Sequence, residues 1–460
     1  MNLLKGLLCI TTIQFANCYH IKNMRINDNL GRELVYHGVN LVYKLSPWHS
    51  SLNEFNYNLH SQMNDYNILS ELGLNFVRLG VMWSGVEPER NKYNYSYIQT
   101  MKNIVGNLEK KNISVLIEFH LDALSEYYCG EGLPDWAVNN SNFPFPVTSA
   151  YNTSGKPTRE QCLTRDWWKY QFSHEASKKY QELYDNTSLR RAFFNYWEII
   201  AKSFNESKNV IGYEIMNEPW PGDIYSDPEL LIAKNANEKN LQVFYDEIFM
   251  FLNNKNYLKN KLFLFEPITW SELGSHFKNP CLNSNDNSSN QCVLSYHCYF
   301  PPQISVDQTF KSRLRDMEQM NTAGFLTEVG SDRLHDIFER LDESFQSVSV
   351  WTYKRNAGIT GDGSMFFNKN GSNESTRLLL NRTYPRAICG HGKYFNFNVT
   401  ANTFVLIYEN NNACTGMTEI FLNGKMNISI SPESEYFISN SILYVYANSQ
   451  NIDIKIVGDH

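Results

Sequence analysis

The chain has 460 residues, a hydrophobic share of 42% and a formal net charge of −7. This length exceeds one domain of ordinary size, and the apolar share is sufficient for a large core. An acidic chain without a basic stripe cannot neutralise a phosphate backbone, so the composition argues against nucleic acid as a partner. The charge alone selects no substrate.

The N-terminal segment MNLLKGLLCITTIQFANCYH predicts a secretory signal peptide over residues 1–18. Lys5 precedes an apolar run from Leu7 to Ile13, which gives way to small and polar residues. The alternative is a buried N-terminal strand. The run is too short to cross a bilayer, and no later stretch reaches about 18 uninterrupted apolar residues. We therefore expect a secreted or lumenal protein, extracellular or lysosomal.

Glycosylation sequons support the same expectation. Each Asn-x-Ser/Thr site is a weak signal alone, because an Asn-rich composition generates some of them by chance. Together they are dense, at Asn94, Asn112, Asn139, Asn152, Asn186, Asn205, Asn287, Asn370, Asn373, Asn381, Asn398 and Asn427.

The nine cysteines predict a disulfide-bonded protein. Cys9 and Cys18 fall in the predicted signal peptide, so an odd number remains. Their order along the chain suggests the pairs Cys129–Cys162, Cys281–Cys292 and Cys389–Cys414, with Cys298 free, although sequence leaves the connectivity open. No Cys or His spacing resembles a zinc site, and we predict no metal and no cofactor.

Eight short apolar runs recur along residues 19–375, as strands covered on both faces do. Helical patterns precede several of them, at residues 65–74, 97–112 and 189–204. The alternation predicts a (β/α)₈ TIM barrel, with an excursion between Asp122 and Leu189. The runs are Val35–Tyr43, Asn75–Val81, Ile113–His120, Val210–Pro219, Leu262–Pro267, Cys292–Tyr299, Gly324–Gly330 and Ser347–Lys354.

The pattern changes over residues 376–460. Short alternating runs separated by turn residues begin near Tyr384 and continue to His460. They predict a small antiparallel β-sandwich. The tetrapeptide LNGK at residues 422–425 is typical of a β-hairpin turn. We interpret this unit as a packing support for the barrel rather than as a lipid or carbohydrate binder.

Polar side chains gather where the barrel strands end, which is where catalytic residues of such barrels lie. Each one has an ordinary reading by itself: Arg78 as a structural ion pair, Trp351 as core, and Asn217-Glu218-Pro219 as a plain strand end. The whole set is improbable in a purely structural barrel. It comprises Lys44, Arg78, Glu118, His120, Asn217, Glu218, Glu266, His297, Tyr299, Glu328 and Trp351.

Glu218 and Glu328, after the fourth and seventh strands, predict glycoside hydrolysis. Retaining glycosidases need two carboxyl groups about 5 Å apart, one as nucleophile and one as acid/base. We assign Glu328 as nucleophile, oriented by Arg78 and Tyr299. We assign Glu218 as acid/base, which requires a raised pKa.

Two further residues complete this interpretation of the strand ends. Asn217 would bind a sugar 2-hydroxyl, and Trp351 would form a platform for a sugar ring. Glu266-Pro267 imitates the motif of the fourth strand, and we interpret Glu266 as a decoy or a rim residue.

These residues resemble glycoside hydrolase family 5, in which an Asn-Glu-Pro follows strand four and a Glu follows strand seven, with Arg78, His297 and Tyr299 also matching. Three segments are similar to endoglycoceramidases, which cut between an intact oligosaccharide and ceramide. The segments are GVNLVYKLSPW (38–48), EFHLDALSEYYCGEGLPDWA (118–137) and TYPRAICG (383–390). The similarity covers most of the chain.

The resemblance implies that Lys44, Glu118 and His120 contact the first sugar, with Asn217, Tyr299 and Trp351 lining the same subsite. One departure concerns the third strand. The family usually has Asp-x-His-Gln-Asp there, whereas residues 118–122 read Glu-Phe-His-Leu-Asp. The longer acid and the missing amide leave the glycan preference open.

The sequence therefore predicts a retaining endo-β-glycosidase acting on glycosphingolipids. One alternative is an exo-acting glucosylceramide or steryl-β-glucosidase, or another family 5 β-glycanase. A non-catalytic glycolipid-binding protein is disfavoured because a binder does not need both carboxylates. We also expect transient contact with a membrane surface or lipid micelle, and the loop with Phe143 and Phe145 is a candidate lipid path. The oligomeric state stays open.

Overall fold

The computed structural model describes residues 18–50, 65–138, 156–166, 168–185, 187–283, 291–299, 304–330, 333–353, 367–368, 371–372 and 379–458. The predicted signal peptide, apart from its last residue, and the loop with Phe143 and Phe145 lie outside these ranges. In the described part of the chain, no helix has both the length and the apolar character needed to cross a membrane.

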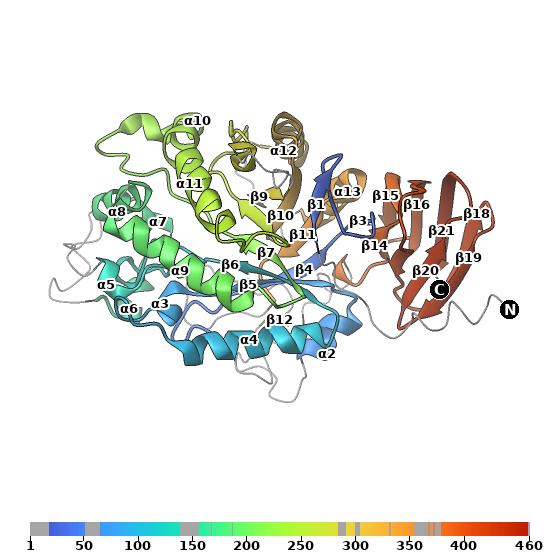
Figure 1. The fold of residues 1–460 in the computed structure, drawn as a ribbon, viewed down its shortest axis with the longest axis horizontal. Coiled ribbons are helices and arrows are strands. Elements are labelled where there is room, and N and C mark those ends of the chain that lie inside the picture. The colour runs from blue at the N-terminus through green and yellow to red at the C-terminus, as the bar shows by residue number, and fades with distance from the viewer. Residues whose placement is uncertain are drawn as a thin grey trace.

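Eight parallel strands close into a barrel (Figure 1). Each predicted run contains one of them, so this part of the prediction is confirmed. Nearly every strand residue is buried, because helices cover the outside of the barrel and side chains fill the inside. The strands are β4 (His37–Leu41), β5 (Phe76–Gly80), β6 (Ser114–Glu118), β7 (Val210–Glu214), β8 (Leu262–Phe265), β9 (Cys292–Cys298), β10 (Ala323–Val329) and β11 (Ser347–Val350).

The helices that cover the barrel are amphipathic, and several of the larger ones begin at a capping side chain. Asn94, Thr187 and Ser305 each accept a hydrogen bond from a main-chain N–H of the first turn, which satisfies a donor that the helix leaves free. The larger helices are α2 (Asp65–Glu71), α4 (Tyr95–Glu109), α8 (His174–Tyr184), α9 (Ser188–Phe204), α11 (Gln242–Asn253), α12 (Val306–Met320) and α13 (Leu334–Ser344).

The excursion between β6 and α9 and the later loops carry the short elements. The disulfide Cys129–Cys162 ties the start of the excursion to its middle. The short elements are α3 (Trp83–Val86), α5 (Asp135–Val138), α6 (Arg159–Cys162), α7 (Trp168–Gln171), α10 (Ala233–Ala236), the 3₁₀ helices Glu126–Tyr128, Pro228–Leu231 and Pro280–Asn283, a π-helical turn Asn237–Leu241, and the strand pair β12 (Phe367–Asn368) and β13 (Gly371–Ser372).

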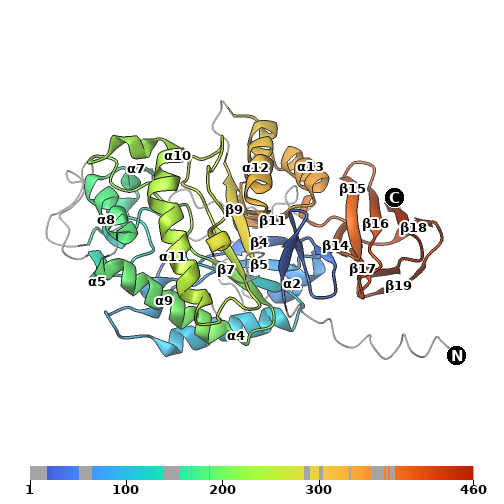
Figure 2. The same cartoon turned by 45° about the horizontal axis from the view of Figure 1, so that its top comes forward.

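The C-terminal unit is an antiparallel sandwich, as predicted, and it lies at one end of the barrel (Figure 2). One sheet has the order β1-β2-β3-β14-β17-β20-β19 and the other β15-β16-β21-β18. Their strands are β1 (His20–Lys22), β2 (Arg25–Asn27), β3 (Glu33–Leu34), β14 (Tyr384–Ile388), β15 (Gly390–Asn398), β16 (Thr403–Asn410), β17 (Thr418–Phe421), β18 (Met426–Ser431), β19 (Glu435–Ser439), β20 (Ile442–Tyr446) and β21 (Asn451–Gly458).

Two features of this sandwich differ from the sequence-based expectation. The strands at residues 20–34, which we grouped with the barrel, extend the sheet of the C-terminal unit through pairing of β3 with β14. The hairpin predicted at LNGK is wrong. β17 pairs with β14 and β20, whereas β18 pairs with β21 in the other sheet, so this turn joins two sheets. A turn tetrapeptide specifies the reversal but not the partner strand.

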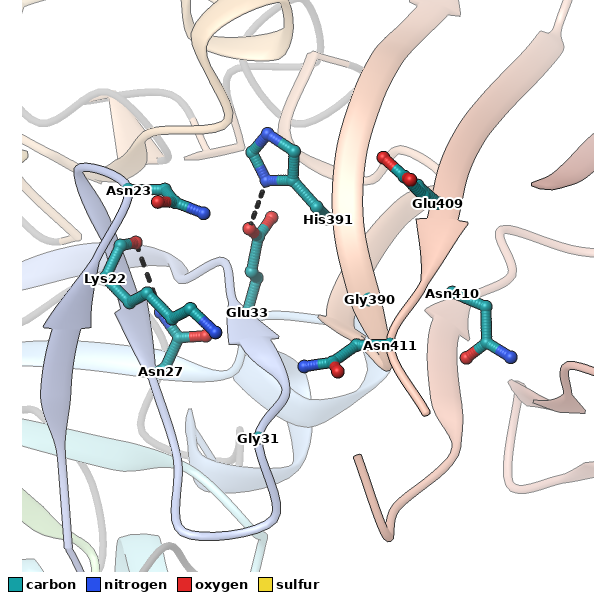
Figure 3. A pocket seen from close by; sticks show the side chains of 10 residues that line it. All are labelled: Lys22, Asn23, Asn27, Gly31, Glu33, Gly390, His391, Glu409, Asn410 and Asn411. Carbon is teal, nitrogen blue, oxygen red and sulfur yellow. Dashed lines mark hydrogen bonds and ion pairs between the residues drawn. The ribbon is translucent and has the colours of Figure 1, made fainter. Parts of the chain in front are cut away.

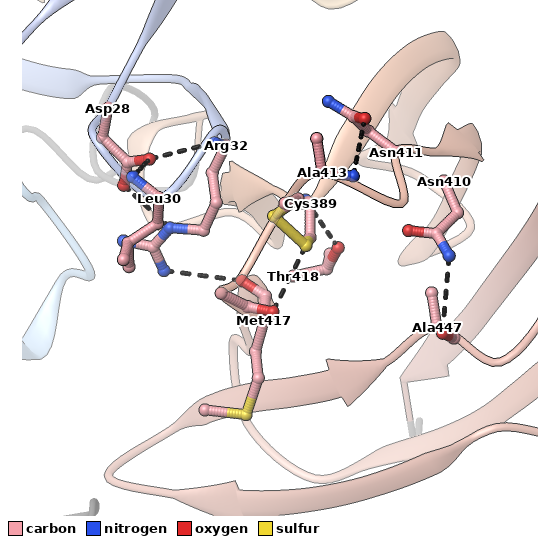
Figure 4. Close-up of a disulfide and its surroundings, with 12 residues drawn as sticks. Asp28, Leu30, Arg32, Cys389, Asn410, Asn411, Ala413, Met417, Thr418 and Ala447 are labelled. Atoms are coloured by element: carbon pink, nitrogen blue, oxygen red, sulfur yellow. Dashed lines mark hydrogen bonds and ion pairs between the residues drawn. A yellow bond between two sulfur atoms is a disulfide. The ribbon is translucent and has the colours of Figure 1, made fainter.

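Buried polar contacts fasten the N-terminal strands to the sandwich. His391 Nδ1 lies 2.6 Å from Glu33 Oε1, at a small polar pocket between β3 and β15 (Figure 3). Arg32 pairs with Asp28 at 2.8 Å and donates to the carbonyl of Met417, close to the Cys389 disulfide (Figure 4).

The predicted disulfides are all present. The structure has the bonds Cys129–Cys162, Cys281–Cys292 and Cys389–Cys414. Cys298, in the barrel strand β9, is buried and free.

Candidate active site

Arg78 on β5 lies at the centre of the predicted site and is fully buried. Its Nε pairs with Glu214, one terminal nitrogen lies 3.2 Å from Glu328 Oε2, and the other donates to Asn217 Oδ1 at 2.8 Å. Burial lowers the pKa of the guanidinium, but the carboxylates of Glu118, Glu214 and Glu328 together raise it by more. The net pKa therefore lies above the usual value of arginine. The fixed cation therefore orients several strand-end side chains at once.

Glu328, at the end of β10, has the partners that the sequence predicted. Arg78 contacts one carboxyl oxygen, and the Tyr299 hydroxyl donates to the other at 2.6 Å. Burial raises the pKa of Glu328 more than His297 and Arg78 lower it. Both oxygens are held in place, so the direction in which the carboxylate faces is fixed.

Glu218 lies four residues beyond β7 and faces His297, whose Nδ1 is 2.8 Å from Glu218 Oε1. Burial and the negative charge of Asp122 raise the pKa of Glu218 to about 7. One carboxyl oxygen of Glu218 lies within 4.8 Å of one of Glu328. This separation matches retaining glycosidases, whereas inverting enzymes need about 6.5 Å or more.

His297 remains a neutral imidazole around the pH at which Glu218 titrates. Burial lowers its pKa to about 4, despite the opposing charge of Glu328. A neutral ring can donate one hydrogen bond and accept another.

Charged groups form a second cluster beside the carboxyl pair. Lys44 pairs with Asp122, and its Nζ lies 3.2 Å from Glu131 Oε1. His120 Nε2 lies 3.3 Å from Asp122 Oδ2. The ring of Trp351 stacks on His120 with centroids 5.2 Å apart.

The position of Glu131 depends on the close approach of two main-chain segments. Asp122 and Glu131 form an antiparallel bridge with N–H···O distances of 3.2 and 2.8 Å. A Cβ at Gly130 would lie 1.7 Å from the Asp122 carbonyl oxygen, so only glycine fits there. Burial raises the pKa of Glu131 to about 8, although Lys44 opposes this.

An aromatic cluster begins at Trp220, two residues after Glu218 in the chain. The Trp220 ring contacts those of Phe172 and Trp270, with centroids 4.8 and 5.1 Å apart. Trp168 continues the cluster outward through Phe172 and is 50% exposed. Further exposed apolar side chains on the same loops are Leu163, Tyr225, Leu231, Ile232 and Leu273.

The comparison with protein-family models gives two matches along the chain. The model described as "Cellulase (glycosyl hydrolase family 5)" matches residues 49–360. The model described as "Glycoside hydrolase family 5 C-terminal domain" matches residues 382–457. The chain belongs to glycoside hydrolase family 5.

Curated relatives within this family extend over nearly the whole chain. An endoglycoceramidase of Hydra vulgaris is 34% identical over 90% of this chain and 84% of its own. An endoglycoceramidase of Cyanea nozakii is 33% identical over 95% of this chain and 90% of its own. Among solved structures, endo-glycoceramidase II from Rhodococcus sp. has a TM-score of 0.76 at 18% identity, covering 94% and 99% of the two chains. That last likeness concerns the fold.

The structure brings all the predicted site residues of this family 5 chain to one end of the barrel. Glu118 is fully buried, with its carboxyl group 3.1 Å from His120 Nδ1 and 3.6 Å from Arg78. Burial raises the pKa of Glu118, but Arg78 and His120 lower it overall. Glu118 therefore supports these two side chains from beneath.

The interpretation of Glu266 as a decoy or rim residue is wrong. Its side chain is buried, and its Oε2 accepts a hydrogen bond from the main-chain N–H of Glu218 at 2.8 Å. The strand-end rule placed it in the right region, but sequence gave no indication that it turns toward the fourth strand.

Sequence reasoning also missed Asn40, Asp122, Glu131 and Glu214. The signal for Glu214 was an acidic residue inside the apolar run of β7. A buried strand tolerates such a residue only when it has a partner, which here is Arg78. Asp122 and Glu131 lie within the quoted family segment, but their meeting depends on the bridge between them.

Three carboxylate–histidine clusters have ligand atoms close enough for a metal ion among the described residues. His120, Asp122 and Glu131 form one, and the Lys44 ammonium already lies between its carboxylates. The other two include His297 and lie next to Arg78. Fixed cations at these positions disfavour a divalent ion by charge repulsion.

Proposed function

We propose that the protein is a retaining endo-β-glycosidase that hydrolyses the bond between oligosaccharide and ceramide in glycosphingolipids. One observation carries the proposal. A carboxyl pair with retaining separation is accompanied by a charged polar cluster and by an aromatic cluster, which we call the polar side and the aromatic side of the site. A substrate with a sugar on one side of the scissile bond and a lipid on the other fits this division. The endoglycoceramidase names of the curated relatives support the same substrate class.

The two carboxyl groups have separate roles in the reaction. Glu328 attacks the anomeric carbon, while Glu218 gives its proton to the glycosidic oxygen and ceramide leaves. Glu218 then takes a proton from water, which hydrolyses the glycosyl–enzyme bond at Glu328. This sequence requires an ionised Glu328 and a protonated Glu218 at the start.

The surrounding residues prepare these ionisation states. Arg78 and Tyr299 contact opposite oxygens of Glu328 and stabilise its carboxylate. Burial and the charge of Asp122 keep the proton on Glu218 up to about pH 7. Asn217, fixed by Arg78, is placed to bind the 2-hydroxyl of the sugar, an interaction that strengthens in the transition state.

The charged cluster binds the glycan. Lys44, Asp122 and Glu131 present donors and acceptors for sugar hydroxyls, and the Trp351 ring provides a face for the pyranose. Glu118 acts through Arg78 and His120 rather than by direct contact.

The aromatic cluster faces the ceramide, because the acid/base lies on the leaving-group side of the bond. We infer that its exposed continuation, Trp168 with Leu231 and Ile232, contacts the membrane or micelle that holds the lipid. Trp at a lipid–water interface has its ring in the apolar layer and its N–H in the wet one. The Phe143 and Phe145 loop remains a further candidate for this contact.

We also infer that the protein works in an oxidising compartment, either secreted or lumenal. The predicted signal peptide and the sequons support this. So do three disulfides in one chain, which are typical of secreted proteins and rare in the cytosol.

Product analysis tests the proposed activity. Purified protein and its Glu328→Gln variant are incubated with a ganglioside and with glucosylceramide in detergent. The released sugars are identified by mass spectrometry. Intact oligosaccharide and ceramide from the ganglioside, absent with the variant, are expected. Glucose from glucosylceramide with untouched ganglioside would instead identify an exo-glucosidase. No product from either lipid would contradict hydrolysis of these substrates.

A further inference from the structure

The main chain of Glu218 has an unusual conformation. Its φ is +38°, in the left-handed region that side chains other than glycine rarely adopt. A non-glycine residue is strained in this conformation, so surrounding contacts must impose it. The conformation turns the chain just where the Glu218 side chain must face the bond to be cleaved.

The segment that follows β8 supplies those contacts. Glu266 Oε2 accepts the Glu218 N–H at 2.8 Å, and Thr269 Oγ1 donates to the Glu218 carbonyl at 3.2 Å. The Thr269 N–H lies 3.4 Å from the carbonyl oxygen of Pro219. Both main-chain polar groups of Glu218 are therefore engaged by one neighbouring segment.

This segment is itself held firmly by the helices behind it. The Tyr245 hydroxyl on α11 donates to the Glu266 carbonyl at 2.8 Å and lies 3.3 Å from the Glu266 nitrogen. The Ile268 N–H donates to Asn237 Oδ1 at 3.0 Å. The contacts to Glu218 thus come from a rigid support rather than from a free loop.

The carboxyl groups of Glu266 and Glu218 both lie close to the same nitrogen of His297. His297 Nδ1 lies 2.8 Å from Glu218 Oε1 and 3.4 Å from Glu266 Oε1. Glu214 and Arg78 are the other charged groups near Glu266. Burial, Glu214 and Glu218 raise the pKa of Glu266 well above its usual range, against the effect of Arg78. The Glu266 carboxyl group therefore loses its proton less readily than an exposed glutamate does.

We propose that Glu266 and Thr269 are positioning residues that hold the main chain of Glu218, and with it the acid/base carboxyl group, in the reactive orientation. The proposal rests on the acid/base role given to Glu218 above. This proposal assigns a function to Glu266-Pro267, the second Glu-Pro motif of the chain. The function does not depend on contact between Glu266 and the sugar.

A leaving-group comparison separates this role from simple structural support. Departure of 2,4-dinitrophenolate needs no proton, whereas departure of 4-methoxyphenolate does. Aryl β-lactosides or β-glucosides with these two leaving groups are therefore compared by kcat/KM. For Glu266→Ala and Thr269→Val we expect a loss of about 10²-fold or less with the 4-methoxyphenyl glycoside, the scale of a small misplacement. The dinitrophenyl glycoside should change by less than about twofold, since it bypasses the acid.

Glu266→Gln is the conservative variant. It keeps the shape of the side chain and an oxygen that can accept the Glu218 N–H, so it should restore kcat/KM for the 4-methoxyphenyl glycoside to within about threefold of wild type. Thr322→Ala removes a hydroxyl-to-carbonyl bond of the same kind, to Cys292, at the opposite end of β10, although this one is buried. This control should leave the ratio of the two kcat/KM values unchanged.

Several results would overturn the proposal: an equal loss with both leaving groups, no loss with either, or a Glu266→Gln variant as impaired as Glu266→Ala. Thr269 is exposed, so Thr269→Val tests the proposal even if Glu266→Ala fails to fold. Because soluble aryl glycosides are used, a failure to cleave gangliosides would reject the proposed lipid substrate without affecting this measurement.

Discussion

The two sides of the carboxyl pair are built from opposite kinds of side chain. On one side, Lys44 and Asp122 form a buried ion pair, and the buried carboxyl group of Glu131 lies beside them. On the other, Trp220 and Phe172 begin an aromatic surface that becomes steadily more exposed. Buried charges recognise a polar ligand through directed hydrogen bonds, whereas an exposed apolar surface binds through the area it removes from water. The difference indicates an amphiphilic substrate cleaved where its two halves meet.

The two sides also differ in the elements that anchor them, although both include residues of the excursion between β6 and α9. The polar side is anchored by strand ends, by the bridge between Asp122 and Glu131, and by the disulfide at Cys129. The aromatic side is carried by the loops after β7 and β8 and by the excursion before α9. Rigid strand ends suit precise hydrogen bonding, and loops suit contact with a fluid lipid phase.

Loss of the nucleophile should have the largest effect, because every substrate reacts at Glu328 whichever side of the site binds it. We expect Glu328→Gln to lower kcat by about 10⁴-fold or more with lipid and soluble substrates alike. Binding should survive, since the amide keeps the shape of the side chain. The measurement is kcat on a ganglioside and on an aryl β-lactoside. Substantial turnover by the variant would refute the assignment of Glu328.

A substitution at Lys44 tests the polar side. Lys44→Met removes the ammonium that pairs with Asp122 and contacts Glu131, and breaking a buried ion pair costs about 3–5 kcal/mol of stability. We expect kcat/KM to fall by about 10²-fold equally for lipid and soluble glycosides, because both carry the sugar. Thermal unfolding and kinetics measure the two effects.

An exposed lysine gives the control for that variant. Lys92→Met breaks the solvent-exposed pair with Glu89 and should change neither quantity. A Lys44→Met effect confined to the lipid substrate would contradict the division of the site.

The aromatic side can be broken at Trp168 and Phe172. We expect the double variant Trp168→Ser and Phe172→Ser to lower kcat/KM about 10-fold for a ganglioside in phospholipid vesicles, because apolar area toward the lipid is lost. The soluble aryl β-lactoside should be cleaved normally.

The sandwich offers a matched control at the far end of the molecule. Tyr436→Ser and Ile438→Ser remove equally exposed apolar side chains from β19 and should leave vesicle activity unchanged. If these changes matter as much as those at Trp168 and Phe172, the lipid surface has been misplaced.

The pH profile gives the smallest and sharpest comparison, since it shows a charge of the polar side acting on the acid/base. With the pKa of Glu218 raised to about 7, kcat/KM should decline above that pH as the acid loses its proton. The raised pKa of Glu328 sets the acid limb, because protonation there removes the nucleophile.

Asp122→Asn removes a negative charge that raises the pKa of Glu218. The alkaline limb should therefore move to lower pH, by less than about one unit, whatever happens to the amplitude. A limb that stays in place or moves upward would show that Asp122 does not act on the acid/base.

Sequence predicted most where the physics is local. Eight apolar runs became eight barrel strands because a strand covered on both faces has no polar alternation. Glu218 and Glu328 were found because strand ends are where such barrels carry catalysis.

The misses share a different origin, since they depend on contacts between distant segments. Glu131 reaches Lys44 only through its bridge to Asp122, and Glu266 turns to a neighbouring strand for its partner. The LNGK turn joins two sheets because the pairing of β17 and β18 is decided by strands elsewhere in the chain.

The most direct test of the account uses the Glu218→Ala variant with 2,4-dinitrophenyl β-lactoside and intact-protein mass spectrometry. This substrate glycosylates the enzyme without an acid, but without Glu218 no base activates water for the second step. We expect a lactosyl–enzyme that accumulates, maps to Glu328 after proteolysis, and is released by azide. The absence of an adduct, or an adduct on Glu266 or Glu131, would contradict the roles assigned to the two glutamates.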